Sequence, residues 1–272
     1  MDETSEQSGR VVDYYRKMAQ DYDKEYEAPY WKELYDKITW HYIEPYLPKK
    51  GLILDAGGGT GKWAIPMAEM GLEVVVYDIS REMLDVALRK AKERNLEKLI
   101  QVREGDICGI DYPDNYFDFV LAEGDPISYC SDPDKAVGEL SRVLKPDCFI
   151  SAGVDSLFSI ARRRLSSKLD VDEALKILQE KRLYAEFWGF HCWAFSPKNL
   201  KDLFEKHSLR TLKIAGKPVF VPRETEPLLQ DPEKAKKALE IELKLCEEQS
   251  IVGYGGHLHI VARKPRNAQK PV

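Results

Sequence analysis

A glycine-rich segment directly after a short apolar run is the most informative feature of this 272-residue sequence. Residues 52–61 read LILDAGGGTG, and Asp55 stands where the apolar run ends. Glycine then recurs at every second position, at Gly57, Gly59 and Gly61. This order predicts a buried parallel strand, a tight turn and the start of a helix, so that backbone N–H groups can approach a nucleotide-like ligand. A dinucleotide-binding loop has the different spacing G-x-G-x-x-G.

Two further carboxylates stand at the ends of the next two predicted strands. Asp78 closes the run EVVVYD, and Asp106 follows the third apolar run within EGDI. Because the carboxyl ends of parallel strands meet at one edge of a sheet, Asp55, Asp78 and Asp106 are expected to lie close together. Alone, each would be a turn or capping residue. Their joint placement predicts a ligand site at this edge.

The pattern Asp-x-Gly-x-Gly-x-Gly resembles motif I of the class I S-adenosylmethionine-dependent methyltransferases, in particular the small-molecule enzymes. NYFDFVLAEG and AVGELSRVLKPDCFIS resemble the family's fourth strand and its following helix, turn and fifth strand, although Asp147 and Cys148 replace two usual glycines. The resemblance spans about Val11–Val154, with a closing pattern to about Lys264. It implies S-adenosylmethionine as cofactor and a Rossmann-like α/β fold. The expected sheet has seven mostly parallel strands, an antiparallel edge strand and a helical cap insertion.

The same resemblance implies how the cofactor is held. Asp55 would stand near its ammonium group, Asp78 would accept hydrogen bonds from the ribose hydroxyls, and Asp106 would meet the adenine amino group. Apolar side chains would cover the adenine ring, and a tyrosine of an N-terminal helix would help to close the site. The expected cofactor-binding residues are Tyr14, Tyr22, Asp55, Ala56, Gly57, Gly59, Gly61, Asp78, Ile79, Met83, Asp106, Ile107 and Glu123.

Three residues are candidates for the catalytic step. Glu123 and Asp125 lie in AEGDPISYC, a loop that would face the methyl group, and either could act as a base if the acceptor must lose a proton. His191 lies in an aromatic cluster near the expected cap. Each also has a structural interpretation, as a cofactor contact, a turn residue or a packed histidine. His257 and His259 alternate on one strand and share a face, but without a third ligand they predict no metal site.

The elements that must position these residues follow an alternation of short apolar runs and helical segments between residues 53 and 154. This alternation predicts βαβ units and a parallel sheet covered on both faces. The first ten residues are expected to be disordered, and residues 155–187 have helical periodicity without an intervening strand. Ser80 and Ser196 are expected to cap helices, and Pro29 to separate two N-terminal helices.

Five segments are therefore expected. They are an N-terminal helical lid (1–48), a cofactor-binding core (49–154), a helical cap insertion (155–195), the C-terminal completion of the core sheet (196–265) and a flexible tail (266–272).

Composition and charge disfavour several classes of function. With a net charge of −5, unspecific binding to a nucleic-acid backbone is not expected. No apolar run approaches the roughly 20 residues of a membrane span, and the polar, acidic start is unlike a signal peptide. Five scattered cysteines without C-x-x-C spacing favour a reducing compartment. We therefore expect a cytoplasmic enzyme that acts on a small-molecule acceptor and has no membrane partner.

Three alternatives stay open at this point. Methylation of a protein or RNA would be favoured by a basic, anion-binding surface around Arg162–Lys168. A non-catalytic protein of the same fold could bind the cofactor without turnover. A nicotinamide-dependent reductase is disfavoured by the glycine spacing. The sequence leaves the oligomeric state and the identity of the methylated atom open.

Overall fold

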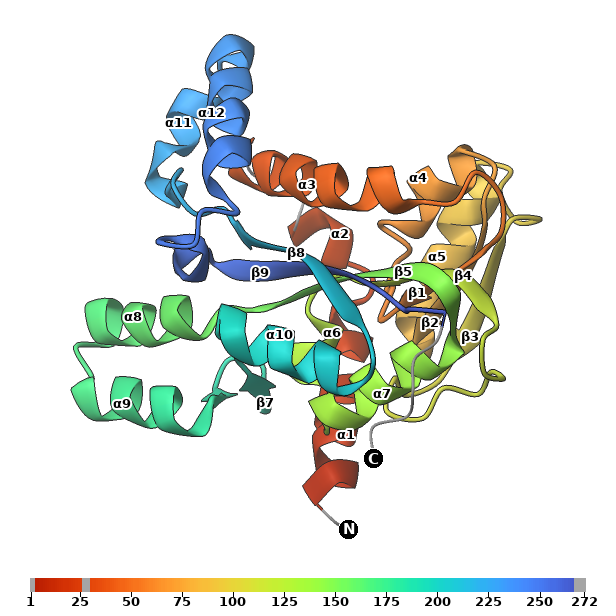
Figure 1. The fold of residues 1–272 in the computed structure, drawn as a ribbon, viewed down its shortest axis with the longest axis horizontal. Coiled ribbons are helices and arrows are strands. Elements are labelled where there is room, and N and C mark those ends of the chain that lie inside the picture. The colour runs from red at the N-terminus through yellow and green to blue at the C-terminus, as the bar shows by residue number, and fades with distance from the viewer. Residues whose placement is uncertain (1–2, 26–29, 267–272) are drawn as a thin grey trace.

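A seven-stranded sheet forms the centre of the computed structural model, which describes residues 3–25 and 30–266 (Figure 1). In chain order its strands are β1 (Leu52–Ala56), β2 (Glu73–Asp78), β3 (Ile100–Glu104), β4 (Phe117–Ala122), β5 (Leu144–Asp155), β8 (Arg210–Lys217) and β9 (His257–Arg263). In space they are ordered β3-β2-β1-β4-β5-β9-β8. Strands β1 to β5 pair in parallel, whereas β9 runs antiparallel to both β5 and β8. The predicted, mostly parallel sheet with antiparallel pairing towards one edge is confirmed.

The strand order reverses at the centre of the sheet. From β1 the chain proceeds outward through β2 and β3, and then returns to β4 on the other side of β1. In open α/β sheets such a reversal leaves a crevice beyond the carboxyl ends of the two central strands, where ligands bind. The glycine-rich segment follows β1 at this place. The topology therefore puts the predicted ligand site at the reversal.

Helices cover both faces of the sheet (Figure 1). One face carries α3 (Tyr30–Ile43), α4 (Ala64–Glu69) and α5 (Arg81–Glu93), and the other carries α7 (Pro133–Val143) and α10 (Pro197–Lys206). Because side chains alternate along a strand, Ile53 packs with the buried residues of α4 and α5, and Leu54 with those of α7 and α10. The predicted caps are confirmed: Ser80 accepts a hydrogen bond from the Met83 N–H, and Ser196 from the Asn199 N–H.

The N-terminal segment differs from the expectation of ten disordered residues. Helix α1 (Glu3–Met18) begins inside that stretch, and α2 (Tyr22–Glu25) follows it. The buried Gln7 side chain donates to the carbonyl oxygens of Tyr129 and His191, at 3.0 and 2.7 Å, and accepts from the His191 N–H. These hydrogen bonds to residues far away in the sequence hold the start of α1 in place, although its own sequence is polar and has little apolar pattern. The expected break at Pro29 lies outside the described residues.

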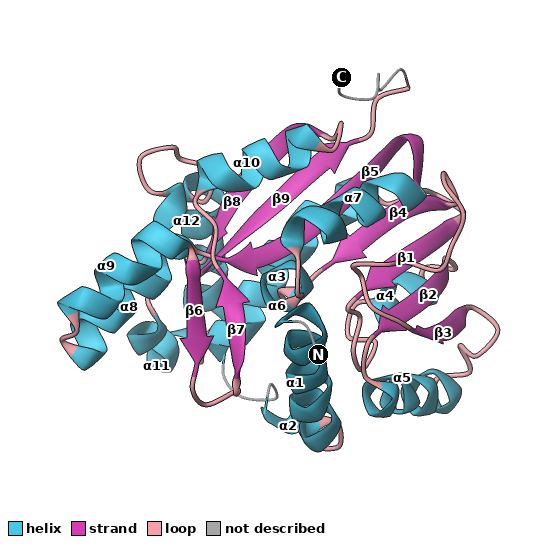
Figure 2. Ribbon diagram, turned by 90° about the horizontal axis from the view of Figure 1, so that it is seen from below, coloured by secondary structure: helices cyan, strands magenta, loops and turns pink. Residues whose placement is uncertain are grey.

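The expected helical insertion is only partly helical. It contains α8 (Leu157–Lys168) and α9 (Val171–Glu180), but these are followed by the antiparallel hairpin of β6 (Arg182–Ala185) and β7 (Phe190–Trp193). The expectation of no strand here is wrong, because two four-residue strands are too short to show a clear period of two. Leu183, Phe190 and Cys192 turn inward and form a separate buried cluster with residues of α8. Figure 2 shows the hairpin beside α1.

Six further helical elements of the described residues complete the fold. They are α6 (Pro126–Tyr129), α11 (Glu226–Leu229), α12 (Pro232–Leu245) and the 3-10 helices η1 (Glu44–Tyr46), η2 (Arg223–Thr225) and η3 (Val252–Tyr254). Helices α11 and α12 pack against α3 beside β8 (Figure 1). Among the described residues, no helix has the length and apolar character to cross a membrane. Of the expected C-terminal tail, only Arg266 is described.

Candidate functional site

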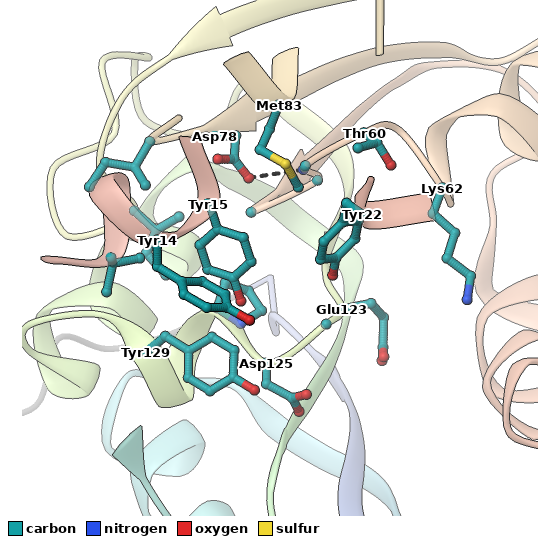
Figure 3. Close-up of a pocket in the computed structure, with 18 of the residues that line it drawn as sticks. Tyr14, Tyr15, Tyr22, Thr60, Lys62, Asp78, Met83, Glu123, Asp125 and Tyr129 are labelled. Carbon is teal, nitrogen blue, oxygen red and sulfur yellow. Dashed lines mark hydrogen bonds between the residues drawn. The ribbon is translucent and has the colours of Figure 1, made fainter. Parts of the chain in front are cut away.

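A cavity of about 310 Å³ lies at the carboxyl ends of β1, β2 and β4. The turn after β1, the end of β2 and the loop after β4 form its floor. Helices α1, α2 and α3 contribute tyrosines to the opposite wall. In Figure 3 the rings of Tyr14, Tyr15 and Tyr22 lie between Asp78 at one end of the cavity and Asp125 at the other. The cavity is therefore built from both the core and the N-terminal helices.

The turn after β1 needs glycine at two positions that line the cavity. Gly57 has a φ of +71°, and a Cβ there would lie 2.4 Å from the Cβ of Pro126. Gly59 has a φ of +52°, and a Cβ there would lie 3.1 Å from the methyl carbon of Met83. Any larger residue would be strained and would fill the cradle. The N–H of Gly59 donates to Oδ2 of Asp78 at 2.9 Å, which ties the turn to the end of β2.

Asp55 lies beneath this turn and is fully buried. A Cβ on Gly58 would lie 2.8 Å from its carboxyl carbon, so the carboxylate packs directly under the backbone of a cavity-lining residue. Neither of its side-chain oxygens has a hydrogen-bond partner among the described residues. Burial, with the nearby charges of Asp78 and Glu123, raises the pKa of Asp55 to about 7. A buried carboxylate with open acceptor positions directly under a cavity-lining turn suits a cationic group of a ligand.

Asp78 holds the backbone at the end of β2. Its Oδ1 accepts from the Ser80 N–H and its Oδ2 from the Gly59 N–H, each at 2.9 Å. Burial raises the pKa of Asp78 to about 6, against the lowering effect of these hydrogen bonds. Each carboxylate oxygen has a second lone pair, so the group can still accept from a ligand hydroxyl. Asp78 thus combines a structural contact with a place on the cavity wall.

The end of β3 supplies the neighbouring part of the wall, with Asp106 and Ile107. Oδ1 of Asp106 accepts from the Cys108 N–H at 2.8 Å, and Oδ2 accepts from the Ser8 hydroxyl at 2.9 Å. The second contact joins α1 to the sheet edge. Sequence reasoning missed Ser8, because nothing in its local sequence links it to a strand almost a hundred residues away.

Glu123, which directly follows β4, belongs to a buried ionic network. Its Oε2 lies 2.9 Å from Nζ of Lys217, and its Oε1 lies 2.8 Å from Nδ1 of His259. Lys217 also donates to Thr39, and His259 contacts Ser151 through Nε2. Burial alone would raise the pKa of Glu123, but Lys217 and His259 outweigh it and hold this pKa at about 2. Glu123 is therefore held as an ionised carboxylate between Lys217 and His259.

Asp125 meets a histidine that sequence reasoning considered only as half of a metal pair. Its Oδ1 lies 3.0 Å from Nδ1 of His257, which opens β9 and lines the cavity. A second carboxylate, Asp155 at the end of β5, lies 3.9 Å from the same nitrogen. Burial and the Asp125 charge raise the pKa of Asp155 to about 7. His257 and His259 share one face of the strand, as their alternation predicts, but each meets a different carboxylate.

Most of the residues expected at the site line this cavity, and four do not. Asp55 lies under the turn, Ala56 is buried in β1, and Gly61 packs its backbone against α5. His191 lies in β7, with its ring against Tyr184 at a centroid distance of 5.1 Å. The structure does not bring His191 to the cavity, so its expected catalytic role is not carried further.

Other lining residues were missed because they stand on helices and turns whose local sequence has no feature specific to a ligand site. They are Tyr15, Trp31, Lys32, Tyr35, Thr60, Lys62, Trp63, Tyr129 and Trp188. Nζ of Lys32 and Nζ of Lys62 lie 2.7 and 2.6 Å from the carboxylate of Asp36. Burial and the charge of Lys62 lower the pKa of Lys32 to about 8. The N-terminal segment is rich in aromatic residues, but this pattern is typical both of a cavity wall and of a hydrophobic core and does not distinguish them.

Comparisons with known proteins agree with this geometry. Residues 53–147 match a family model described as a methyltransferase domain. YqeM of Bacillus subtilis is 37% identical over 130 residues, so the chain spans about half of that relative (51%) and the match covers 47% of this chain. The tRNA 5-carboxymethoxyuridine methyltransferase of Escherichia coli is 24% identical over 246 residues, which cover 88% of this chain and 91% of that enzyme.

Solved structures show the same fold. A SAM-dependent methyltransferase from Methanosarcina mazei has a TM-score of 0.60 and 20% identity, and the match covers 82% of this chain and 97% of that one. The matched domain, the strand order and the glycine turn agree with one another, and the predicted family, enzyme class and cofactor are confirmed. Residues 53–147 thus form a methyltransferase domain, in a chain whose fold is that of the class I S-adenosylmethionine-dependent methyltransferases.

Proposed function

We propose that this enzyme transfers the methyl group of S-adenosylmethionine to a small-molecule acceptor by in-line displacement. The enclosed cavity supports this proposal most strongly, because tyrosines of α1, α2 and α3 cover the sheet edge from the opposite side (Figure 3). Such a cover excludes water and fixes a small acceptor in line with the methyl group, which supplies most of the acceleration for a displacement of this kind.

The residues present fit the cofactor. The cradle between Gly57 and Gly59 has no room for a Cβ, and Asp55 beneath it has two oxygens without a hydrogen-bond partner among the described residues. In this proposal the turn and Asp55 hold the amino-acid part, Asp78 accepts from the ribose hydroxyls, and Asp106 accepts from the adenine amino group. When bound, S-adenosylmethionine supplies an electrophilic methyl group on a sulfonium sulfur.

The charge distribution supports a small acceptor over a nucleic acid. The basic run of α8 would be the anion-binding surface, yet three of its four charged side chains contact other groups in the same part of the molecule. Arg164 pairs with Glu173 at 3.4 Å, and Lys168 pairs with Glu186 at 2.8 Å. Arg162 lies over the Tyr254 ring, 5.2 Å from its centroid. A surface paired in this way offers few cations to a phosphate backbone.

Relatives of both kinds exist. The demethylmenaquinone methyltransferase of Thermus thermophilus is 42% identical over 102 residues, which cover 36% of this chain and 44% of that enzyme. Its named substrate is a small molecule. The E. coli enzyme that modifies tRNA aligns over most of the chain, so transfer to tRNA is the second candidate function. For that reaction a nucleotide would have to enter the cavity past α1.

Labelled methyl transfer distinguishes the two candidates. The purified protein is incubated with methyl-tritiated S-adenosylmethionine and a cell extract, which is then separated into metabolites, RNA and protein. Label in metabolites is expected, and label in RNA alone would replace the proposal with the second candidate. The matched control is Gly57→Val, whose side chain would occupy the cradle. Binding of S-adenosylhomocysteine without label in any fraction would favour a non-catalytic cofactor-binding protein.

A further inference from the structure

We propose that His257 is the general base of the reaction, and that the acceptor is accordingly a protic nucleophile with an ionisable O–H, N–H or S–H group. The proposal rests on methyl transfer in this cavity and names the substrate class of the same site. It differs from the expectation that Glu123 or Asp125 is the base.

Two carboxylates and an aromatic ring surround the imidazole of His257 and fix its orientation. Nδ1 lies 3.0 Å from Oδ1 of Asp125 and 3.9 Å from Oδ1 of Asp155. The ring stands edge-on to Tyr35, with centroids 5.4 Å apart. Nε2 makes no hydrogen bond with the described residues, and the side chain is 29% exposed, whereas the two carboxylates are below 10%. A carboxylate on Nδ1 selects the tautomer whose Nε2 lone pair is available to a substrate.

The backbone of Asp125 is arranged for this contact. Asp125 stands at the N-cap of α6 with a φ of +66°, a left-handed conformation that costs free energy in residues other than glycine. An aspartate at an N-cap ordinarily accepts hydrogen bonds from the first N–H groups of its helix. Here the side chain makes no such bond and turns to His257 instead. The side chain of Asp125 therefore orients His257 and does not cap α6.

Glu123, one of the two expected bases, is less suited to take a proton. Glu123 is held ionised by Lys217 and His259, and a carboxylate with a pKa of about 2 is a weak base. The groups that face His257 are Asp125, Asp155, Lys217 and the Tyr35 ring. Burial and Lys217 would lower the pKa of His257, but the two carboxylates outweigh them and raise it above its ordinary value. A base with a pKa near neutrality is the most effective at physiological pH.

The acceptor's proton passes to Nε2 of His257, and the acceptor atom uses the electron pair of its former bond to hydrogen to bond the methyl carbon. The bond between this carbon and the sulfonium sulfur breaks, and its electron pair stays on sulfur. Asp125 stabilises the imidazolium that forms, and Nε2 later returns its proton to water.

The first test needs no acceptor. Imidazole ¹H–¹⁵N spectra are titrated with pH on the full chain saturated with S-adenosylhomocysteine, and His257→Gln assigns the signal. We expect neutral His257 to carry its proton on Nδ1 and to titrate above the ordinary value of about 6.5. In Asp125→Asn this pKa should fall. A proton on Nε2 of neutral His257, or a titration that Asp125→Asn leaves unchanged, would overturn the proposal.

The second test compares methyl transfer into the metabolite pool. His257→Gln should lower the rate by about 10²- to 10⁴-fold without changing the affinity for S-adenosylhomocysteine. The matched control is His207→Gln, which removes another histidine–aspartate pair, with Asp134 at 3.0 Å, that does not line the cavity. It should retain the wild-type rate. A His257→Gln variant as fast as wild type refutes the base, whereas a wild type that binds no S-adenosylhomocysteine refutes the proposed function.

Discussion

Replacing Lys217 by methionine should destabilise the protein strongly, because it would leave the buried, charged carboxylate of Glu123 without its cationic partner. The two side chains are 0% and 1% exposed, and their charged atoms are 2.9 Å apart. The pKa of Glu123 falls from its model-peptide value of 4.5 to about 2, which corresponds to about 3 kcal/mol at about 1.4 kcal/mol per tenfold change in proton affinity. Breaking a buried ion pair typically costs about 3–5 kcal/mol. We therefore expect a loss of about 3–5 kcal/mol at pH 7.

Thermal unfolding followed by calorimetry measures this loss. For a chain of this length, about 3–5 kcal/mol corresponds to a decrease in Tm of roughly 5–9 °C. Lys213→Met is the matched control on the same strand, because Lys213 pairs with Glu247 at the surface, and it should cost less than about 1 kcal/mol.

The pH dependence gives a second signature of the same pair. A carboxylate with a depressed pKa stabilises the wild type above pH 4.5, and this contribution is lost as the pH falls towards about 2. In Lys217→Met burial raises the pKa of Glu123, so mild acid protonates the carboxylate and removes part of the penalty. The two proteins should therefore approach each other in stability as the pH decreases. A small, pH-independent effect of Lys217→Met would refute this account of the network.

Two further predictions concern the cofactor end of the cavity. Asp78→Ala should abolish detectable binding of S-adenosylhomocysteine and also destabilise the fold by about 1–3 kcal/mol, because the buried Gly59 and Ser80 N–H groups lose their acceptor. Calorimetric titration measures the binding and thermal unfolding measures the stability, and an unaltered affinity would refute the assignment of Asp78 to the ribose. Gly57→Ala should weaken S-adenosylhomocysteine binding at least about tenfold, since its Cβ would lie 2.4 Å from Pro126 at a positive φ; an unchanged Kd would show that the turn is not the cradle.

The cofactor half of the site was predictable because its geometry is local. Asp55 and Asp78 close apolar runs and Asp106 stands just beyond β3, and parallel strands bring such ends to one edge. The pattern could not predict how deeply each carboxylate lies below the cavity wall. Asp55 lies one layer below the cavity wall, since the backbone of Gly58 passes over it, and this depends on how tightly the turn closes.

The acceptor half depends on pairings across the whole chain. Alternation in β9 correctly predicts that His257 and His259 share a face, but the carboxylates that they meet come from the end of β5 and from the loop between β4 and α6. From its sequence, Lys217 would be expected to be an exposed charged residue at the end of an edge strand, yet it is fully buried. Registers between distant strands decide these contacts, and no local property of the sequence encodes them.

Calorimetric titration of the wild-type protein with S-adenosylhomocysteine, with NADH as comparator, tests the central claim most directly. The cradle at Gly57 and Gly59, with Asp78 and Asp106 beyond it, predicts one site per chain with micromolar affinity and no heat from NADH. Absence of binding, or equal binding of NADH, would contradict the assignment of this cavity to S-adenosylmethionine.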